Sequence, residues 1–213
     1  MTLKTAKSDK DIFPDVGDVA PDFTLTSLRG KQISLARYQG KSHVVLWFSR
    51  GFTCNFCRNY MQSVIDAYSE MQAAGIEVIQ VAPNLLDSAR AYFDDGPPFP
   101  FLCDPDKRMY AVYGLGDRGV LEATKNMVIG MTAPLAQSVQ AEVETIRASW
   151  LDVANRSFLR RLHHHALTAI DQGVFIIDRQ GVVRYRQVVG SMEKILTGAE
   201  MLQLTTAVCQ PNE

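Results

Sequence analysis

This sequence has few cysteines and no excess of positive or negative charge. Its 213 residues include only four cysteines, too few for a disulfide scaffold at this length, so we expect free thiols unless some of them cycle in catalysis. Lys plus Arg number 22 and Asp plus Glu 23. Such a balance produces no long-range field to attract a polyanion or an acidic membrane surface, so nucleic acid is not an expected partner.

Long apolar runs are also missing. No segment approaches the roughly 20 apolar residues that a membrane helix needs, and the polar stretch Met1–Lys10 lacks the apolar core of a secretory signal. We therefore expect a soluble, cytoplasmic protein with no membrane association. What the sequence does contain is 46% hydrophobic residues, ample for one sizeable core, so a single domain over residues 1–213 is predicted.

The apolar pattern of the first half predicts strands and helices in alternation. Residues 22–26 and 32–35 alternate apolar and polar side chains around a glycine turn, which indicates a hairpin. Residues 43–48 form a continuous apolar run, typical of a central strand buried on both faces. A helix over 53–74 and a strand over 76–81 follow, and this order implies a parallel, right-handed crossover.

The second half continues the alternation. We expect, in chain order, a helix over 85–93, a short strand over 98–102, a helical turn over 107–113, a hairpin of strands over 173–178 and 182–186, and a closing helix over 197–209. The predicted fold class is therefore α/β, with a central mixed sheet flanked by helices and an N-terminal hairpin.

The stretch of about 117–170 is longer than the usual connection in an α/β unit. Apolar residues recur there at steps of three and four from Val139 to Val153, with Trp150 among them, so we predict a helical insertion. The stripe could pack on the core, cover a site as a lid, or form the surface of a homodimer, and the sequence leaves all three open. The run His163 to His165 is interpreted as part of a solvated face.

The motif that carries chemistry is the pair Cys54 and Cys57, spaced as Cys-x-x-Cys where the strand over 43–48 leads into a helix. At such a junction both sulfurs lie in or near the first helical turn, close enough to bridge. Unpaired backbone N–H groups and the positive end of the helix dipole stabilise a thiolate there. Arg50 and Arg58 add positive charge, and the thiolate is the nucleophilic form of cysteine.

The cysteines have two alternative explanations. A zinc site needs two further ligands, and neither Cys103 nor the histidine run supplies a second spaced pair. Inert buried thiols are a second alternative, but the order strand, Cys-x-x-Cys, helix is the context that a redox motif requires. No metal and no organic cofactor is implied. Cys103 is interpreted as a structural thiol and Cys209 as a semi-exposed helix thiol without a role, with a resolving role left open for each.

Four segments carry features of one family: residues 19–25, 40–41, 101–106 and 174–181. Together they resemble the alkyl hydroperoxide reductase/thiol-specific antioxidant family, the peroxiredoxins, within the thioredoxin-like superfamily. The likeness covers most of the chain outside the insertion. It implies a thioredoxin-type sheet flanked by helices, and reduction of peroxides at the expense of a thiol donor.

The signature of that family is a proline, a threonine four positions on, and the peroxidatic cysteine three further. The matching positions here are Arg50, Cys54 and Cys57, a pattern that looks like a peroxiredoxin-like branch. By resemblance, Cys57 occupies the peroxidatic place, while Cys54 replaces the threonine and stands where the thioredoxin nucleophile stands. Gln172 stands near the place of the family's arginine and of the thioredoxin cis-proline, so Arg50 or Arg58 would have to polarise a peroxide.

The resemblance implies that a Cys57 thiolate attacks a hydroperoxide and that Cys54 then condenses with the sulfenic acid to form a disulfide. A thioredoxin- or glutathione-like donor would reduce that disulfide. Arg50, Thr53 and Arg58 are the predicted substrate-binding or thiolate-stabilising residues. Two alternatives stay open: a protein disulfide reductase in which Cys54 attacks first, and a redox sensor or binding module whose partner surface is the insertion.

Overall fold

The computed structural model describes residues 13–51, 55–93, 96–117, 170–190 and 193–209. The predicted helical insertion, with its stripe and Trp150, lies outside the described residues, so its shape and the homodimer surface stay predictions. Within the described part, no helix is both long and apolar enough to cross a bilayer.

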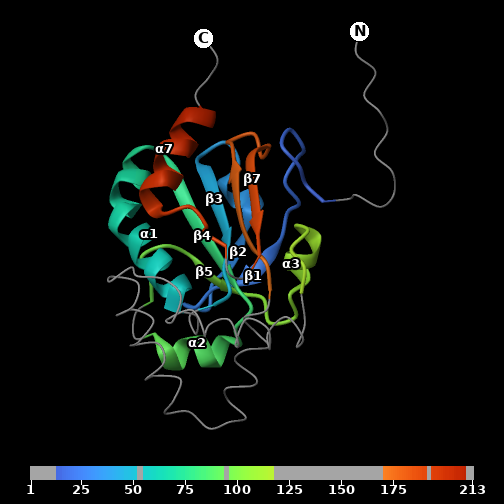
Figure 1. The fold of residues 1–213 in the computed structure, drawn as a ribbon, viewed down its shortest axis with the longest axis vertical. Helices are drawn as coiled ribbons and strands as arrows, with labels where there is room; N and C mark the ends of the chain where they lie inside the picture. The colour runs from blue at the N-terminus through green and yellow to red at the C-terminus, as the bar shows by residue number, and fades with distance from the viewer. Residues whose placement is uncertain (1–12, 52–54, 94–95, 118–169, 191–192, 210–213) are drawn as a thin grey trace, which may run out of the picture.

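A five-stranded mixed sheet forms the centre of the molecule, in the order β5-β4-β3-β6-β7 (Figure 1). Its strands are β3 (His43–Phe48), β4 (Ile76–Ala82), β5 (Phe101–Cys103), β6 (Gln172–Ile177) and β7 (Val183–Val189). The neighbours β3, β4 and β5 run parallel, whereas β6 pairs antiparallel with both β3 and β7. The central position predicted for β3 is confirmed, because it is hydrogen-bonded on both edges.

Helices cover both faces of this sheet (Figure 1). Helices α1 (Asn55–Ala73) and α7 (Gly198–Val208) lie side by side on one face, and the short α3 (Arg108–Val112) lies on the other. Helix α2 (Leu86–Tyr92) follows β4. The predicted α/β class, with a thioredoxin-like central sheet flanked by helices, is confirmed.

A small hairpin precedes the main sheet. Strands β1 (Thr24–Thr26) and β2 (Gln32–Ser34) pair antiparallel, and a 3-10 turn, η1 (Leu35–Tyr38), leads from them towards β3. The glycine between the strands, Gly30, has a φ of +77°, a backbone conformation that L side chains rarely adopt. The predicted N-terminal hairpin is therefore present.

The side chains of β3 alternate between two hydrophobic cores. Val45 and Trp47 belong to the core beneath α1 and α7, while Val44, Leu46 and Phe48 belong to the core beneath α3. All but Val44 are fully buried, and Val44 is nearly so. A strand with both faces covered has no polar face, which explains why its sequence is a continuous apolar run.

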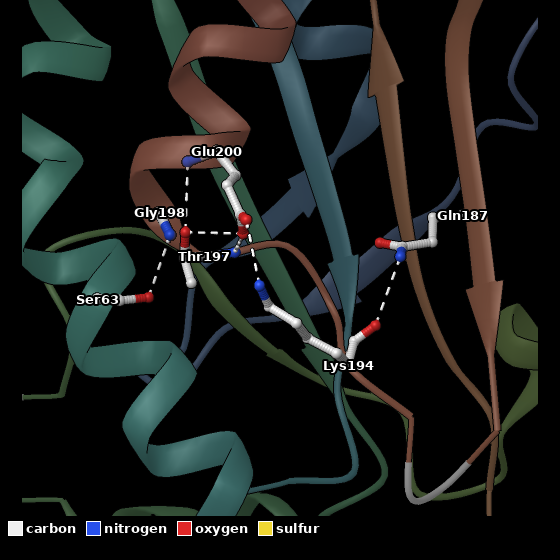
Figure 2. A network of polar contacts seen from close by, with 6 residues as sticks. All are labelled: Ser63, Gln187, Lys194, Thr197, Gly198 and Glu200. Atoms are coloured by element: carbon white, nitrogen blue, oxygen red, sulfur yellow. Dashed lines mark hydrogen bonds and ion pairs between the residues drawn. The ribbon is translucent and has the colours of Figure 1, made fainter.

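Helix α7 is fastened to α1 at its own first turn (Figure 2). The Gly198 backbone N–H donates to Ser63 Oγ of α1 over 3.1 Å. A Cβ on Gly198 would overlap the Ser63 carbonyl and would lie 2.8 Å from Val64 Cα, so only glycine permits this approach of the two helices. The contact helps to hold α1 against the sheet.

Candidate active site

The candidate site lies where β3 ends and α1 begins. Cys57 is in the first turn of α1 and is 1% exposed. Two predicted site residues, Thr53 and Cys54, lie outside the described residues, so the predicted bridging distance between Cys54 and Cys57 remains a prediction. The first turn of α1 carries no acidic side chain, which leaves its positive dipole end uncompensated by a local carboxylate.

Gln172 contacts the Cys57 sulfur. The thiol donates to Gln172 Oε1 over 3.5 Å, and the glutamine is 1% exposed. Gln172 begins β6, and the next residue, Gly173, pairs with Phe48 at the end of β3. Sheet register therefore brings the two residues together across 115 positions of sequence.

From the sequence, Gln172 indicated only that the family's arginine and the thioredoxin cis-proline are absent. Its contact with Cys57 was not predicted. The available signal was a polar residue at the start of an otherwise apolar strand, Gln172–Ile177, in which every residue is buried. A buried amide must find hydrogen-bond partners, so a glutamine in that position predicts a polar neighbour. Which neighbour it meets depends on the antiparallel register of β3 and β6.

A buried polar network holds the loop that leads out of β3. The Tyr110 hydroxyl lies within hydrogen-bond distance of the Ser49 carbonyl and, at 3.0 Å, of the Val81 carbonyl. Gln80 Nε2 donates to Ser49 Oγ over 2.9 Å, and the same oxygen accepts from the Gly51 N–H over 3.2 Å. Burial raises the pKa of Tyr110 well above its usual value, so the phenol stays protonated and acts as a donor.

Gly51 turns the loop towards α1. Its φ is +86°, and a Cβ there would overlap the side chain of Asn84. Asn84 is buried just after β4. A glycine is therefore required both by the backbone angle and by the close packing of the Asn84 amide, which follows the neighbouring parallel strand β4.

The two arginines expected to supply positive charge differ in their surroundings. Arg50, in the loop between β3 and α1, is 6% exposed. Arg58 is half-buried, and its Nη1 donates to the Tyr92 hydroxyl of α2 over 2.8 Å. Arg58 thus connects α1 with α2, whereas Arg50 is a buried cation in the loop that carries the site.

Cys103 and Cys209 have environments that suppress thiolate formation. Burial raises the pKa of the Cys103 thiol to about 11, although Arg90 opposes the change. Burial also raises the pKa of Cys209, at the end of α7, to about 11. Both are free thiols and remain protonated near neutral pH, which agrees with the structural role expected for Cys103 and with the absence of a role expected for Cys209.

Comparison with known proteins places this geometry in a family. The model of the AhpC/TSA family matches residues 16–186. The chain belongs to the AhpC/TSA family. The match spans the loop after β3, the first turn of α1 and Gln172 at the start of β6, so the family region contains the whole candidate site. Like the family, the chain is a thiol-dependent redox enzyme.

Individual members of the AhpC/TSA group and its neighbours show the breadth of the likeness. A protein of Mycobacterium tuberculosis (strain CDC 1551 / Oshkosh) named as a peroxiredoxin is 30% identical over 118 residues, which cover 54% of this chain and 74% of the relative. The thiol-disulfide oxidoreductase ResA of Bacillus anthracis is 29% identical over 103 residues, 47% of this chain and 58% of ResA. The crystal structure of the peroxidoxin BcpB from Mycobacterium tuberculosis shares the fold, with a TM-score of 0.60 and 15% identity over 92% of this chain and 99% of that one.

Proposed function

We propose that this enzyme reduces hydroperoxides, with Cys57 as the attacking sulfur and Cys54 as the resolving sulfur. The observation that supports this most is the burial of Cys57, which is 1% exposed. Attack on the disulfide of a folded protein needs an exposed sulfur, so the burial of Cys57 supports a small substrate such as a hydroperoxide for an attack by this sulfur. The family match and the peroxiredoxin relative point to the same substrate class.

The proposed cycle has three steps. The Cys57 thiolate attacks one peroxide oxygen, an S–O bond forms, the O–O bond breaks, and the leaving oxygen takes a proton as alcohol or water. The Cys54 thiolate then attacks the Cys57 sulfenic acid, the S–O bond breaks as the disulfide forms, and the leaving hydroxide takes up the proton that Cys54 had lost and departs as water. A thioredoxin- or glutathione-like donor returns both thiols by two exchange steps and is itself oxidised. Such donors suit the cytoplasmic location predicted from the sequence.

The charge around α1 supports Cys57 as the site of the thiolate. The helix N-terminus has no carboxylate in its first turn, and the buried Arg50 adds a cation to the loop before it. Both favour an anion at this end of the helix. We assign Arg50 the main role in polarising the peroxide, with Thr53 and Arg58 as further contributors to the site.

A second candidate is thiol-disulfide exchange with a protein partner, in which Cys54 attacks first. The likeness to ResA favours it. The two functions differ in which sulfur attacks and in which substrate is turned over, so cysteine variants separate them.

The test is a donor-coupled peroxidase assay together with mass spectrometry after a peroxide pulse. Cys57→Ser should lose reaction with peroxide because the attacking sulfur is gone. Cys54→Ser should consume about one equivalent, accumulate sulfenic acid and then over-oxidise, because the resolving thiol is missing. Cys209→Ser, which removes a thiol at the far end of α7, is the matched control and should turn over like the wild type.

The opposite result would reverse the assignment. If Cys54→Ser is inert and Cys57→Ser acquires the sulfenic acid, Cys54 is the attacking sulfur. If the wild type takes up a single equivalent of peroxide and never turns over with a thiol donor, the protein is a sensor and not a peroxidase.

A further inference from the structure

The contact between Cys57 and Gln172 joins two fully buried groups from separate elements. The Sγ to Oε1 distance is 3.5 Å, and each residue is 1% exposed. The Gln172 amide oxygen accepts this hydrogen bond from the Cys57 thiol. Loss of the Cys57 proton therefore removes the donor of the hydrogen bond that the Gln172 carboxamide accepts.

The backbone holds Gln172 in place without help from its side chain. Gln172 pairs with Val189 of β7. Just before it, the Asp171 N–H donates to the Gly116 carbonyl over 3.0 Å, and the Gly116 N–H donates to Asp171 Oδ2 over 3.1 Å. Because backbone pairing with β7 and the hydrogen bonds between Asp171 and Gly116 hold this part of the strand, the Gln172 side-chain amide is not required to build the sheet.

A carboxamide is suited to a sulfur that changes its protonation state. Its oxygen accepts a hydrogen bond from a thiol, and its NH₂ group donates one to a thiolate. The torsion at the end of a glutamine side chain is soft and roughly two-fold, so a half-turn exchanges the two groups without moving the backbone. A carboxylate could only accept from the thiol, and a guanidinium could only donate to the thiolate.

We propose that Gln172 is a positioning residue that holds the Cys57 sulfur in both protonation states, through its amide oxygen in the thiol and through its amide nitrogen in the thiolate. The inference rests on the proposed function, in which Cys57 is the attacking sulfur. The nitrogen contact is charge-assisted and therefore the stronger of the two. Gln172 thus favours the thiolate and fixes its direction without placing a second charge in the buried site.

The test compares three variants by the pH dependence of Cys57 alkylation with iodoacetamide, assigned by tandem mass spectrometry, and by the rate of reaction with hydrogen peroxide. Gln172→Met keeps the length of the side chain and removes both polar groups. Gln172→Glu keeps the shape and adds an acceptor with negative charge. Gln187→Met is the control, since that glutamine lies in β7 and its Nε2 donates to the Lys194 carbonyl.

We expect the alkylation midpoint to rise by about one pH unit in Gln172→Met, because the thiolate loses a stronger hydrogen bond than the thiol does. It should rise further in Gln172→Glu, where a carboxylate faces the developing thiolate. The peroxide rate at neutral pH should fall about tenfold with the one-unit shift, and Gln187→Met should match the wild type. A purely structural role would not produce this order of midpoints.

Equal midpoints for Gln172→Met and the wild type would overturn the inference, as would a shifted midpoint with an unchanged peroxide rate. If Gln172→Glu does not fold, the comparison of Gln172→Met with the wild type decides alone. Failure of the proposed function is visible separately, as peroxide reaction that persists in Cys57→Ser. The alkylation midpoint needs no peroxide and reports on the sulfur contact in either case.

Discussion

Two helix N-termini in this protein differ in their acidic residues: the first turn of α7 contains a glutamate, and the first turn of α1 contains none. At α7, Thr197 Oγ1 accepts from the Glu200 N–H over 3.4 Å, and Glu200 Oε2 accepts from the Thr197 N–H over 2.7 Å, which forms a capping box (Figure 2). The backbone hydrogen bond from Thr197, followed by that of its hydroxyl, lowers the pKa of Glu200. At α1, no acidic residue occupies the first turn, and a thiol stands there instead.

The difference shows how one physical effect supports two roles. Unpaired N–H groups and the helix dipole favour an anion at either terminus. At α7 the anion is permanent and local, so it stabilises the fold. In the described first turn of α1, an anion arises when Cys57 loses its proton, and a carboxylate in that turn would repel it. The lack of acid at α1 is therefore as informative as the cysteine itself.

The largest effect should come from removing the buried cation near α1. Arg50→Met should slow the reaction of Cys57 with peroxide by about 10- to 100-fold, because positive charge that favours the anion is lost. Arg58→Met is the matched variant, and its effect should be smaller since Arg58 donates to Tyr92. Stopped-flow measurement of peroxide reduction at neutral pH would compare them. A greater loss in Arg58→Met would show that Arg58 is the important cation.

The next largest effect is on stability and concerns the contact between Gly198 of α7 and the backbone of α1. Gly198→Ala should lower the free energy of unfolding by about 1–3 kcal/mol, because the new methyl group meets the α1 backbone and forces the helices apart. Urea denaturation followed by circular dichroism would measure it. Ala199→Gly, one residue further along α7, is a control for helix propensity alone and should cost about 1 kcal/mol or less. A Gly198→Ala protein as stable as the wild type would show that the two helices can separate without cost.

The smallest effect is confined to the capping box and depends on pH. Thr197→Ala should cost about 1 kcal/mol of stability at neutral pH, with the peroxide rate unchanged. The lowered pKa of Glu200 means that its contribution is present above its usual value of 4.5 and is lost as pH falls through the folded-state pKa. The gap between wild type and Thr197→Ala should therefore narrow in acid, as judged by denaturation curves at several pH values. A gap that is constant with pH would show that the Thr197 hydroxyl does not act through Glu200, because the backbone hydrogen bond to Glu200 remains in Thr197→Ala.

Much of the fold could be predicted because its signals are local. The strand over 43–48 was predicted with the bounds that the structure has, since a continuous apolar run has few alternative explanations. The helix predicted over 197–209 is present as Gly198–Val208 with Thr197 as its N-cap, because Thr197 and Glu200 have capping spacing. The helix that carries Cys57 is described from Asn55 to Ala73, which lies within the predicted range of 53–74.

The candidate site was predictable only in part. Cys57 at the start of a helix follows from the order of strand, cysteine pair and helix, which is readable along the chain. The distinction between Arg50 and Arg58 was not, because burial depends on what packs above each guanidinium. The support that Tyr110 gives to the loop at Ser49 joins residues 61 positions apart, and no periodicity in the sequence records such a pairing.

By itself, then, the sequence determined the alternation of strands and helices and the presence of a thiol at a helix N-terminus, because both depend on residues that are near neighbours in the chain. Only the tertiary structure decided that Gln172 meets the Cys57 sulfur, that Arg50 is buried and that Arg58 reaches Tyr92. The physical reason is register. The pairing of Phe48 with Gly173 sets which side chain stands beside the sulfur, and a slip of one residue would turn Gln172 to the other face of the sheet.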